Sequence, residues 1–212
     1  GVPPGVINIV HGRGAGIGEE IVKHKDVPVI SFTGGTETGK KINTLCANNF
    51  KKVSLELGGK NPTIIFSDCD FDKALETSVR AAFLNQGQIC LCGSRVFVEK
   101  RLYPKFKSAF VNEVKKLVVG NPSNKNSFLG AVVSKDHMEK ILYYIDMAKK
   151  EGGAILCGGK QVFLKGKLKD GYYVSPTVIT GLGHLCRLNQ EEVFGPVVSI
   201  IPFENEKDVI KM

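Results

Sequence analysis

The sequence predicts an α/β protein, in which helices cover a largely parallel sheet. Three observations support this class. Short apolar runs alternate with segments of helical periodicity, glycine-rich turns separate several of them, and the composition is that of a globular protein. With 212 residues, 42% hydrophobic and 24% charged, the chain can bury a sizeable core, which excludes a disordered or collagen-like polypeptide.

The first part of the chain alternates strand and helix. We expect strands at residues 6–10, 27–32 and 52–57, with helices reaching to about Lys25 and spanning residues 40–48. Glycine-rich loops follow the first two strands, and this order is typical of a parallel sheet. A break at Gly58-Gly59 ends the segment. We therefore assign residues 1–57 to one domain and residues 58–212 to a second.

The second domain continues the alternation. Apolar spacing predicts helices over residues 70–85, 106–117 and 138–148, and apolar runs predict strands at residues 62–66, 96–98, 171–179 and 197–203. Ser134 is a suitable N-cap for the helix over 138–148, and Gly152 is a suitable residue after its end. Residues 206–212 begin a helical pattern that is too short to be stable alone.

Charge and apolar content exclude several classes of protein. The 29 basic and 21 acidic residues leave a net charge of +8, but the lysines are spread along helical patterns without an aromatic-rich nucleic-acid motif. The longest apolar stretch, residues 197–203, is far shorter than the roughly 20 residues of a membrane-spanning helix. We therefore expect neither a nucleic-acid partner nor a membrane partner.

Cysteine usage indicates the redox compartment. The six cysteines are irregularly spaced and no signal peptide is visible, which favours free thiols in a reducing compartment, so we expect a cytoplasmic protein. Cys90-Leu91-Cys92 lacks the spacing of a zinc knuckle, and His184 with Cys186 is only a weak pair. No metal site is expected.

Two glycine-rich loops could hold a phosphate. Residues 12–18 lie between a strand and a helix, but positions 17 and 19 lack the glycines of a dinucleotide fingerprint, which favours a plain turn. The stretch from Gly34 to Lys40 copies the start of a P-loop, but Lys41 stands where Ser or Thr must bind Mg²⁺. A nucleotide-binding or phosphoryl-transfer module remains an alternative. A helix N-terminus with free N–H groups still suits a pyrophosphate.

Cys90 is the strongest candidate for a nucleophile. It follows a predicted helix through Asn85-Gln86-Gly87-Gln88-Ile89, a loop whose small and amide residues let main-chain N–H groups converge on one thiol. An isolated cysteine in an α/β chain is more often an inert buried residue, so the thiol by itself leaves both interpretations open.

Four motifs, in this order along the chain, resemble those of the aldehyde dehydrogenase superfamily. They are Phe32-Thr33-Gly34-Gly35-Thr36-Glu37-Thr38-Gly39, Leu55-Glu56-Leu57-Gly58-Gly59-Lys60, Asn85-Gln86-Gly87-Gln88-Ile89-Cys90 and Glu191-Glu192-Val193-Phe194-Gly195-Pro196. The resemblance covers essentially all 212 residues. It implies the end of a dinucleotide-binding domain in residues 1–57 and most of an α/β catalytic domain in residues 58–212.

The resemblance implies oxidation of an aldehyde to a carboxylic acid with hydride transfer to NAD, with NADP as the alternative acceptor. Cys90 is implied as the nucleophile that forms a thiohemiacetal and then a thioester, with its main-chain N–H in the oxyanion hole. Glu56 is implied as the general base that activates water against the thioester, and Lys60 as a structural or positioning residue. Outside the motif, Glu56 would be interpreted as a solvated carboxylate at a strand end.

For the cofactor, the resemblance implies Gly34 and Gly39 at the pyrophosphate loop, Glu192 at the nicotinamide ribose and Phe194 beside the ring. Gly35 stands where many relatives have Ser, which removes a hydroxyl but leaves the main-chain N–H groups. Without the motif, Glu192 and Phe194 would be interpreted as a surface acid and a core aromatic.

The resemblance also sets expectations for the whole protein. The chain begins within the family's cofactor domain and stops before the family's end, so we expect these residues alone to be inactive as a dehydrogenase. The parent is expected to be a homo-oligomer that acts on a small-molecule aldehyde. Cys90-Leu91-Cys92 and Asn61-Pro62 are similar to the branch that oxidises 2-aminomuconic semialdehyde. A non-catalytic structural protein on the same fold is the other alternative, which the joint presence of Cys90, Glu56 and Glu192 disfavours.

Overall fold

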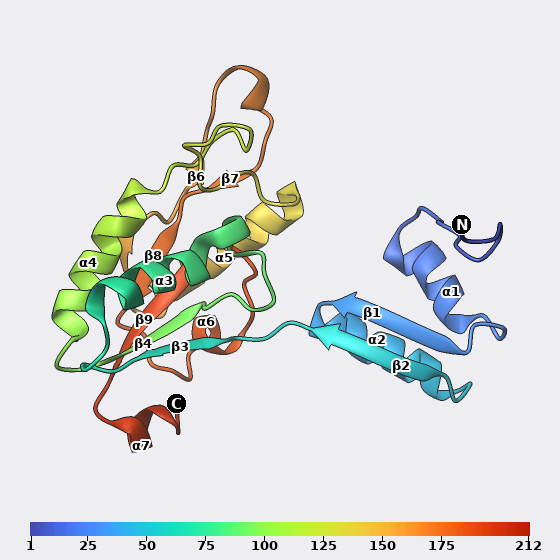
Figure 1. The fold of residues 1–212 in the computed structure, drawn as a ribbon, viewed down its shortest axis with the longest axis horizontal. Coiled ribbons are helices and arrows are strands. Elements are labelled where there is room, and N and C mark those ends of the chain that lie inside the picture. Colours follow the sequence, from blue (N-terminus) through green and yellow to red (C-terminus); the bar gives the residue numbers. More distant parts are fainter. The chain divides into compact units, whose positions relative to one another are not determined.

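The computed structural model describes residues 1–212 and divides the chain into two compact units. Unit 1 comprises Gly1–Gly58 and unit 2 comprises Gly59–Met212. The division falls between the two glycines of the Gly58-Gly59 break. Each unit has strands and helices of its own (Figure 1).

Unit 1 is built on two parallel strands, β1 (Val29–Gly34) and β2 (Lys52–Leu57). Helix α2 (Thr36–Ala47) connects them, and a π-helical turn, η1 (Gly14–Gly18), leads into the short helix α1 (Glu19–Lys23). The strand–helix–strand connection is a βαβ unit. Its core is small, because the buried apolar side chains that pack together are Val22, Ile30, Ile42 and Cys46.

Two expectations for unit 1 are wrong. Residues 6–10 form no strand, because no strand lies beside them to complete a hydrogen-bonded ladder, and their side chains are exposed. Helix α2 begins at Thr36 and not at residue 40, because Gly35 has the extended conformation of an N-cap residue and the helix follows at once. Gly39 therefore lies inside the helix, where an added Cβ would stand 2.6 Å from Cδ2 of Leu57. This glycine permits the close packing of α2 on β2.

Unit 2 contains a five-stranded sheet in the order β3-β4-β9-β8-β5. Its strands are β3 (Pro62–Ile65), β4 (Arg95–Glu99), β5 (Ala154–Cys157), β8 (Thr177–Thr180) and β9 (Val197–Phe203). The first four in that order are mutually parallel, and β5 is antiparallel to β8 at one edge. A mostly parallel sheet with helical connections confirms the predicted α/β class.

Helices cover both faces of this sheet (Figure 1). They are α3 (Phe71–Phe83), α4 (Tyr103–Lys116), α5 (Lys135–Lys150), α6 (Arg187–Gln190) and α7 (Glu206–Val209). Strand β9 shows the two layers, because Val198 and Ile200 join the core beneath α3 and α4, whereas Val197 packs with α5 and α6. Phe203 lies on this second face and contacts α7. A strand buried on both faces is typical of the centre of a parallel sheet.

The strand expected over residues 171–179 is instead two short strands. Pro176 separates β7 (Tyr173–Val174) from β8, and β7 pairs antiparallel with β6 (Gln161–Val162). Strands β5 and β6 were not predicted, because runs this short carry little periodicity. None of the helices combines the length and the apolar character that crossing a membrane requires.

Helix α5 confirms the predicted capping. Oγ of Ser134 accepts a hydrogen bond from the N–H of His137 at 3.2 Å, which satisfies a donor in the first turn. Gly152 follows the end of the helix with φ of +95°, a conformation that glycine adopts without steric cost. The residues that stop and start this helix could therefore be read directly from the sequence.

Candidate active site

The chain enters the cysteine motif through two strained residues. Helix α3 is followed directly by a 3₁₀ turn, η2 (Leu84–Gly87). Asn85 and Gln86 within it have φ of 51° and 57°, a left-handed conformation that residues other than glycine rarely adopt. Strain of this kind persists only where the surroundings hold it, and it clusters at functional sites.

Side-chain amides hold this loop in place. The N–H of Gly130 donates to Oε1 of Gln86 at 3.0 Å, and the N–H of Val133 donates to Oε1 of Gln88 at 3.1 Å. Both bonds join the loop to a segment far along the chain. The two glutamines of the motif therefore fix the main chain that leads to Cys90.

Gly87 brings the cysteine motif against the motif that contains Glu192. Its φ is +68°, and a Cβ at this position would stand 2.3 Å from the carbonyl oxygen of Gly195. Only glycine permits two backbones to approach this closely. Gly195 is in turn packed on α5, since a Cβ on it would stand 2.5 Å from Cδ1 of Ile141. Two motifs that are distant in the sequence thus meet within unit 2.

Cys90 and Cys92 lie in contrasting environments. Cys90 is exposed, and the main-chain N–H groups of Cys90 and Leu91 donate no hydrogen bond within the chain. Cys92 is buried, its Sγ lies 3.2 Å from the carbonyl oxygen of Ala82, and burial raises the pKa of its thiol to about 11. Cys90 is therefore the thiol that an external molecule can reach, and it has free N–H donors beside it.

Glu192 and Phe194 occupy an anchored segment after α6. The N–H of Gly59 donates to Oε1 of Glu192 at 3.3 Å, and Nζ of Lys140 donates to the carbonyl oxygen of Glu192 at 3.2 Å. Phe194 has φ of 58°, and its carbonyl oxygen lies 2.6 Å from Nε2 of His137. Both side chains are half-buried. The structure thus brings both residues into one segment beside the cysteine loop.

Sequence reasoning missed the network that anchors this segment. Nε of Arg187 donates to Oε1 of Glu191 at 2.9 Å, and the hydroxyl of Tyr144 donates to Oε2 at 2.5 Å. These bonds, that of Arg187 first, lower the pKa of the Glu191 carboxyl below its usual value. The motif had drawn attention to Glu191 only as a neighbour of Glu192. Nothing in the sequence pairs it with Tyr144 on α5.

Lys60 lies at the start of unit 2 and is half-buried. Burial lowers the pKa of its amino group to about 8. Its carbonyl oxygen accepts a hydrogen bond from Nε of Arg95 at 2.9 Å, which ties the residue to the beginning of β4. The structural or positioning role of Lys60 stays a prediction.

Unit 1 contains the remaining residues singled out in the sequence. Glu56 lies on β2 opposite Thr33 of β1, and its side chain is exposed. Gly34 is the last residue of β1, and Gly35 then leads into α2, whose N-terminus has no side-chain cap. Residues 36–40 are helical, which disfavours the P-loop alternative because a phosphate-cradling loop needs that stretch to wrap around the anion.

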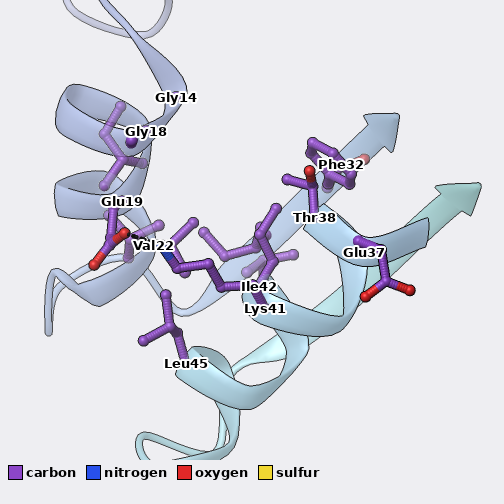
Figure 2. Close-up of a pocket in the computed structure, with 16 residues that line it drawn as sticks. Gly14, Gly18, Glu19, Val22, Phe32, Glu37, Thr38, Lys41, Ile42 and Leu45 are labelled. Atoms are coloured by element: carbon purple, nitrogen blue, oxygen red, sulfur yellow. Dashed lines mark hydrogen bonds and ion pairs between the residues drawn. The ribbon is translucent and has the colours of Figure 1, made fainter. Parts of the chain in front are cut away.

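A cavity of about 700 Å³ lies between α1 and α2 of unit 1 (Figure 2). Val22 of α1 approaches Ile42 and Leu45 of α2 there, and the lining is mostly apolar. Gly14 and Gly18 of η1 also line it, and a Cβ on either would meet no atom within 4 Å. The loop over residues 12–18, which the sequence favoured as a plain turn, therefore borders a cavity that can accept a flat apolar group such as a nucleotide base.

The cavity also has a charged margin. Nζ of Lys41 binds Oε2 of Glu19 at 2.6 Å, and Nζ of Lys23 binds Oε1 at 2.6 Å. The hydrogen bonds from Lys23 and Lys41 lower the pKa of the Glu19 carboxyl to about 2. No three His, Cys, Asp or Glu side chains gather closely enough to hold a metal ion, and all six cysteines are free thiols.

The fold and these sites define a class of protein: an α/β protein with a nucleotide-sized cavity in one unit and an exposed cysteine in an anchored loop of the other. The chain belongs to the aldehyde dehydrogenase family, whose model matches residues 1–212. The family resemblance of the four motifs is therefore confirmed.

Similar proteins include several curated aldehyde dehydrogenases. The chain is 48% identical to 2-aminomuconic semialdehyde dehydrogenase of Mus musculus, over 99% of this chain and 44% of that protein. It is 43% identical to 4-trimethylaminobutyraldehyde dehydrogenase of Homo sapiens, over 100% of this chain and 43% of that protein. The chain thus spans less than half the length of these relatives.

Solved structures of aldehyde dehydrogenases also resemble the chain. The chain is similar to betaine aldehyde dehydrogenase of Staphylococcus aureus in complex with NAD⁺, with a TM-score of 0.95 and 44% identity, over 100% of this chain and 42% of that one.

Proposed function

We propose that the whole protein oxidises an aldehyde to a carboxylic acid with NAD as the hydride acceptor, and that Cys90 is the nucleophile. The observation that carries this proposal is the exposed Cys90 thiol, which sits in a rigidly held loop beside main-chain N–H groups that have no acceptor. Membership of the aldehyde dehydrogenase family supports it.

The chemistry assigned to Cys90 follows from its setting. Its thiolate sulfur attacks the aldehyde carbonyl carbon, a C–S bond forms, and the carbonyl electron pair moves to oxygen. The N–H of Cys90 is placed to stabilise the negative oxygen of the thiohemiacetal. Loss of a hydride from that carbon restores the carbonyl and leaves a thioester. Thiolate is both a strong nucleophile and a good leaving group, which suits this sequence of steps.

Glu56 is proposed as the general base for the second half of the reaction. Its carboxylate takes a proton from water, the resulting hydroxide attacks the thioester carbon, and the C–S bond breaks to release the acid and the thiol. The exposed position of Glu56 at the end of β2 leaves its carboxylate accessible to water. A buried carboxylate without access to water could not fill this role.

Each unit, taken by itself, offers residues that suit one part of a dinucleotide cofactor. The apolar cavity between α1 and α2 suits the adenine ring, and the uncapped N-terminus of α2 beside Gly34 and Gly35 suits a pyrophosphate. Glu192 is proposed to bind the nicotinamide ribose and Phe194 to pack beside the ring, while Gly39 lets α2 lie close to β2. The chemistry that bound NAD supplies is acceptance of the hydride. NADP in its place is an outcome of the test below.

The substrate that we favour is a carboxylate-bearing semialdehyde. The support is comparative: identity is 46–48% to the 2-aminomuconic semialdehyde dehydrogenases of Mus musculus, Danio rerio, Bos taurus and Homo sapiens, against 43% and 44% for the 4-trimethylaminobutyraldehyde enzymes. The 2-aminomuconic 6-semialdehyde dehydrogenase of Pseudomonas sp is 43% identical, so the assay below has to decide between the two substrate classes. Free thiols throughout the chain support a reducing, cytoplasmic location. A homo-oligomer is proposed for the whole protein.

A steady-state assay tests the function. The purified whole protein is incubated with NAD or NADP and a panel of aldehydes, and NADH or NADPH formation is followed by absorbance. An acidic semialdehyde is compared with a trimethylammonium aldehyde of similar length, because only the charge of the remote group differs in sign. We expect the higher kcat/KM with NAD and the acidic semialdehyde. No reduction of either cofactor with any aldehyde would refute the proposed function.

A further inference from the structure

The peptide between Cys90 and Leu91 is the centre of a turn that the N–H of Cys92 closes by donating to the carbonyl oxygen of Ile89 at 2.9 Å, and one side chain bonds to this central peptide directly. Cys90 and Leu91 are both exposed, Leu91 by 80%, so packing does not fix them. Their N–H groups donate to nothing within the chain. The one hydrogen bond that reaches either residue comes from Nδ2 of Asn61, which donates to the carbonyl oxygen of Cys90 at 2.6 Å.

The amide of Asn61 faces two carbonyl groups. Besides Cys90, its Nδ2 donates to the carbonyl oxygen of Cys92 at 3.4 Å. Carbonyl oxygens only accept hydrogen bonds, so the NH₂ side of the amide must face them and the oxygen side cannot. A single NH₂ group thus spans the turn in which Leu91 lies.

Asn61 is itself attached to the sheet. Its carbonyl oxygen accepts a hydrogen bond from the N–H of Arg95 at 3.3 Å, and Nε of Arg95 binds the carbonyl oxygen of Lys60 at 2.9 Å. Strand β3 begins at the next residue, Pro62, which lies opposite Arg95 in the parallel ladder. A side chain that projects from a strand end is a more precise support than one on a mobile loop.

Peptide geometry converts this bond into control of an N–H direction. The peptide group is planar and no peptide bond in the chain is cis, so the carbonyl of Cys90 and the N–H of Leu91 point in opposite directions in one plane. Holding the carbonyl oxygen of Cys90 therefore also sets the direction of the free N–H of Leu91. It restricts the position of the Cys90 thiol on the same residue.

We infer that Asn61 is a positioning residue for Cys90: its amide fixes the peptide that follows the nucleophile and so keeps the thiol and the adjacent N–H groups in their reactive arrangement. This role rests on the proposed function of Cys90 as nucleophile. Asn61 acts through the main chain of Cys90 and is not proposed to touch the substrate.

Two variants of the whole protein test the role. Asn61→Leu keeps the branched shape and removes the donor, whereas Asn61→Asp keeps the shape but replaces the donor with an acceptor that the two carbonyls repel. The matched control is Asn205→Leu, because Asn205 also makes a side-chain bond to the main chain of unit 2, accepting from the N–H of Asp208 at 3.2 Å in α7. Circular dichroism selects temperatures at which every variant is folded.

The first readout is the second-order rate constant for iodoacetamide alkylation of Cys90, measured by peptide mapping without aldehyde or cofactor. We expect both Asn61 variants to slow this reaction about fivefold to tenfold, the range that loss of one well-placed hydrogen bond produces. The half-buried Cys157 serves as an internal reference and should keep its rate, as should Cys90 in Asn205→Leu. A Cys90 rate in the Asn61 variants that is unchanged, or is faster, would overturn the inference.

The second readout is the division between kcat and KM. We expect kcat for aldehyde oxidation to fall with the alkylation rate while the KM for NAD stays within about twofold, because Asn61 supports the nucleophile and not the proposed cofactor site. An equal rise in the KM for NAD would count against the inference. If the wild-type protein oxidises no aldehyde but Asn61→Leu still slows alkylation, the proposed function fails and the positioning role stands.

Discussion

The two units differ in how they support the residues singled out in the sequence. Unit 2 places Cys90, Glu192 and Phe194 above a sheet whose central strand is buried on both faces. Unit 1 places Glu56, Gly34 and the cavity on two strands and a core of four buried side chains. Apolar burial is the main source of stability, so unit 2 has by far the larger internal support.

The difference teaches where rigidity is available for chemistry. In unit 2 the cysteine loop is held by glutamine amides, by the contact of Gly87 with Gly195 and by Asn61. In unit 1 the residues proposed for the cofactor lie at strand and helix ends beside an open cavity. A nucleophile needs a fixed arrangement of thiol and N–H groups, whereas a cavity for a cofactor gains much of its order when the cofactor binds.

The largest expected effect concerns the nucleophile in unit 2. Cys90→Ala in the whole protein should lower kcat by on the order of 10⁵-fold, because no other group can form the thioester. Steady-state NADH formation measures the loss, and Cys157→Ala is the control that should keep most of the activity. If Cys90→Ala retained a tenth of the wild-type rate, Cys90 would not be the nucleophile, and the rigid support of its loop in unit 2 would not explain catalysis.

The next effect concerns the contribution of unit 1 to catalysis in the 212-residue polypeptide, compared with the whole protein. We expect the 212-residue polypeptide to oxidise aldehydes more than about 10³-fold more slowly than the whole protein. The physical reason is that hydride transfer needs a cofactor held against the thiohemiacetal, and the cavity of unit 1 is open to solvent on a thin core.

Calorimetric titration with NAD measures the affinity for the cofactor, and an absorbance assay with saturating aldehyde measures turnover. Alkylation of Cys90 in the same polypeptide is the control, because the loop belongs to unit 2 and should stay intact. Tight NAD binding together with turnover near that of the whole protein would show that unit 1 is better organised than its small core suggests.

A smaller effect is expected for Glu56 in unit 1. Glu56→Gln in the whole protein should lower the steady-state rate by about 10²- to 10³-fold while a rapid burst of NADH remains, because glutamine fills the same space but cannot take a proton from water. Stopped-flow absorbance separates the burst from the slow phase. Glu20→Gln is the matched control, because Glu20 is exposed on α1 of the same unit and does not line the cavity. Full steady-state turnover in Glu56→Gln would mean that another residue is the base.

The smallest effect sharpens the contrast between Cys90 and Cys92 within unit 2. Burial raises the pKa of the Cys92 thiol from 9.0 to about 11. Below pH 9 both the folded and the unfolded state keep this proton, and between pH 9 and 11 only the folded state keeps it. The free energy of unfolding should therefore fall by roughly 1–2 kcal/mol as the pH rises through this window.

Urea unfolding of the whole protein at a series of pH values measures this fall. Cys92→Ser fills a similar volume without titrating in the window, so its free energy of unfolding should lose less between the two pH values. Equal losses in the wild type and in Cys92→Ser would assign the pH dependence to other groups.

The sequence by itself determined the α/β class, the order of most elements and the family. Local signals carried this information: alternating periodicities, the Ser134 cap, and motifs whose residue types are needed for one kind of chemistry. Where neighbours decide the outcome, the local signal failed. Residues 6–10 are as apolar as a strand but have no partner strand. Gly39 has a low helix propensity, so the sequence predicted the start of α2 after it, whereas in the structure the close packing of Gly39 on Leu57 outweighs that propensity.

Only the tertiary structure decided how the site in unit 2 is held. The contact of Gly87 with Gly195, the bonds of Tyr144 and Arg187 to Glu191, and the reach of Asn61 to Cys90 join residues that are far apart along the chain. A sequence motif records which residue types are present but not which backbones approach one another. Such contacts follow from the packing of whole elements around a core, so the same cysteine spacing yields an exposed Cys90 and a buried Cys92 only once α3 and the sheet enclose one side of the loop.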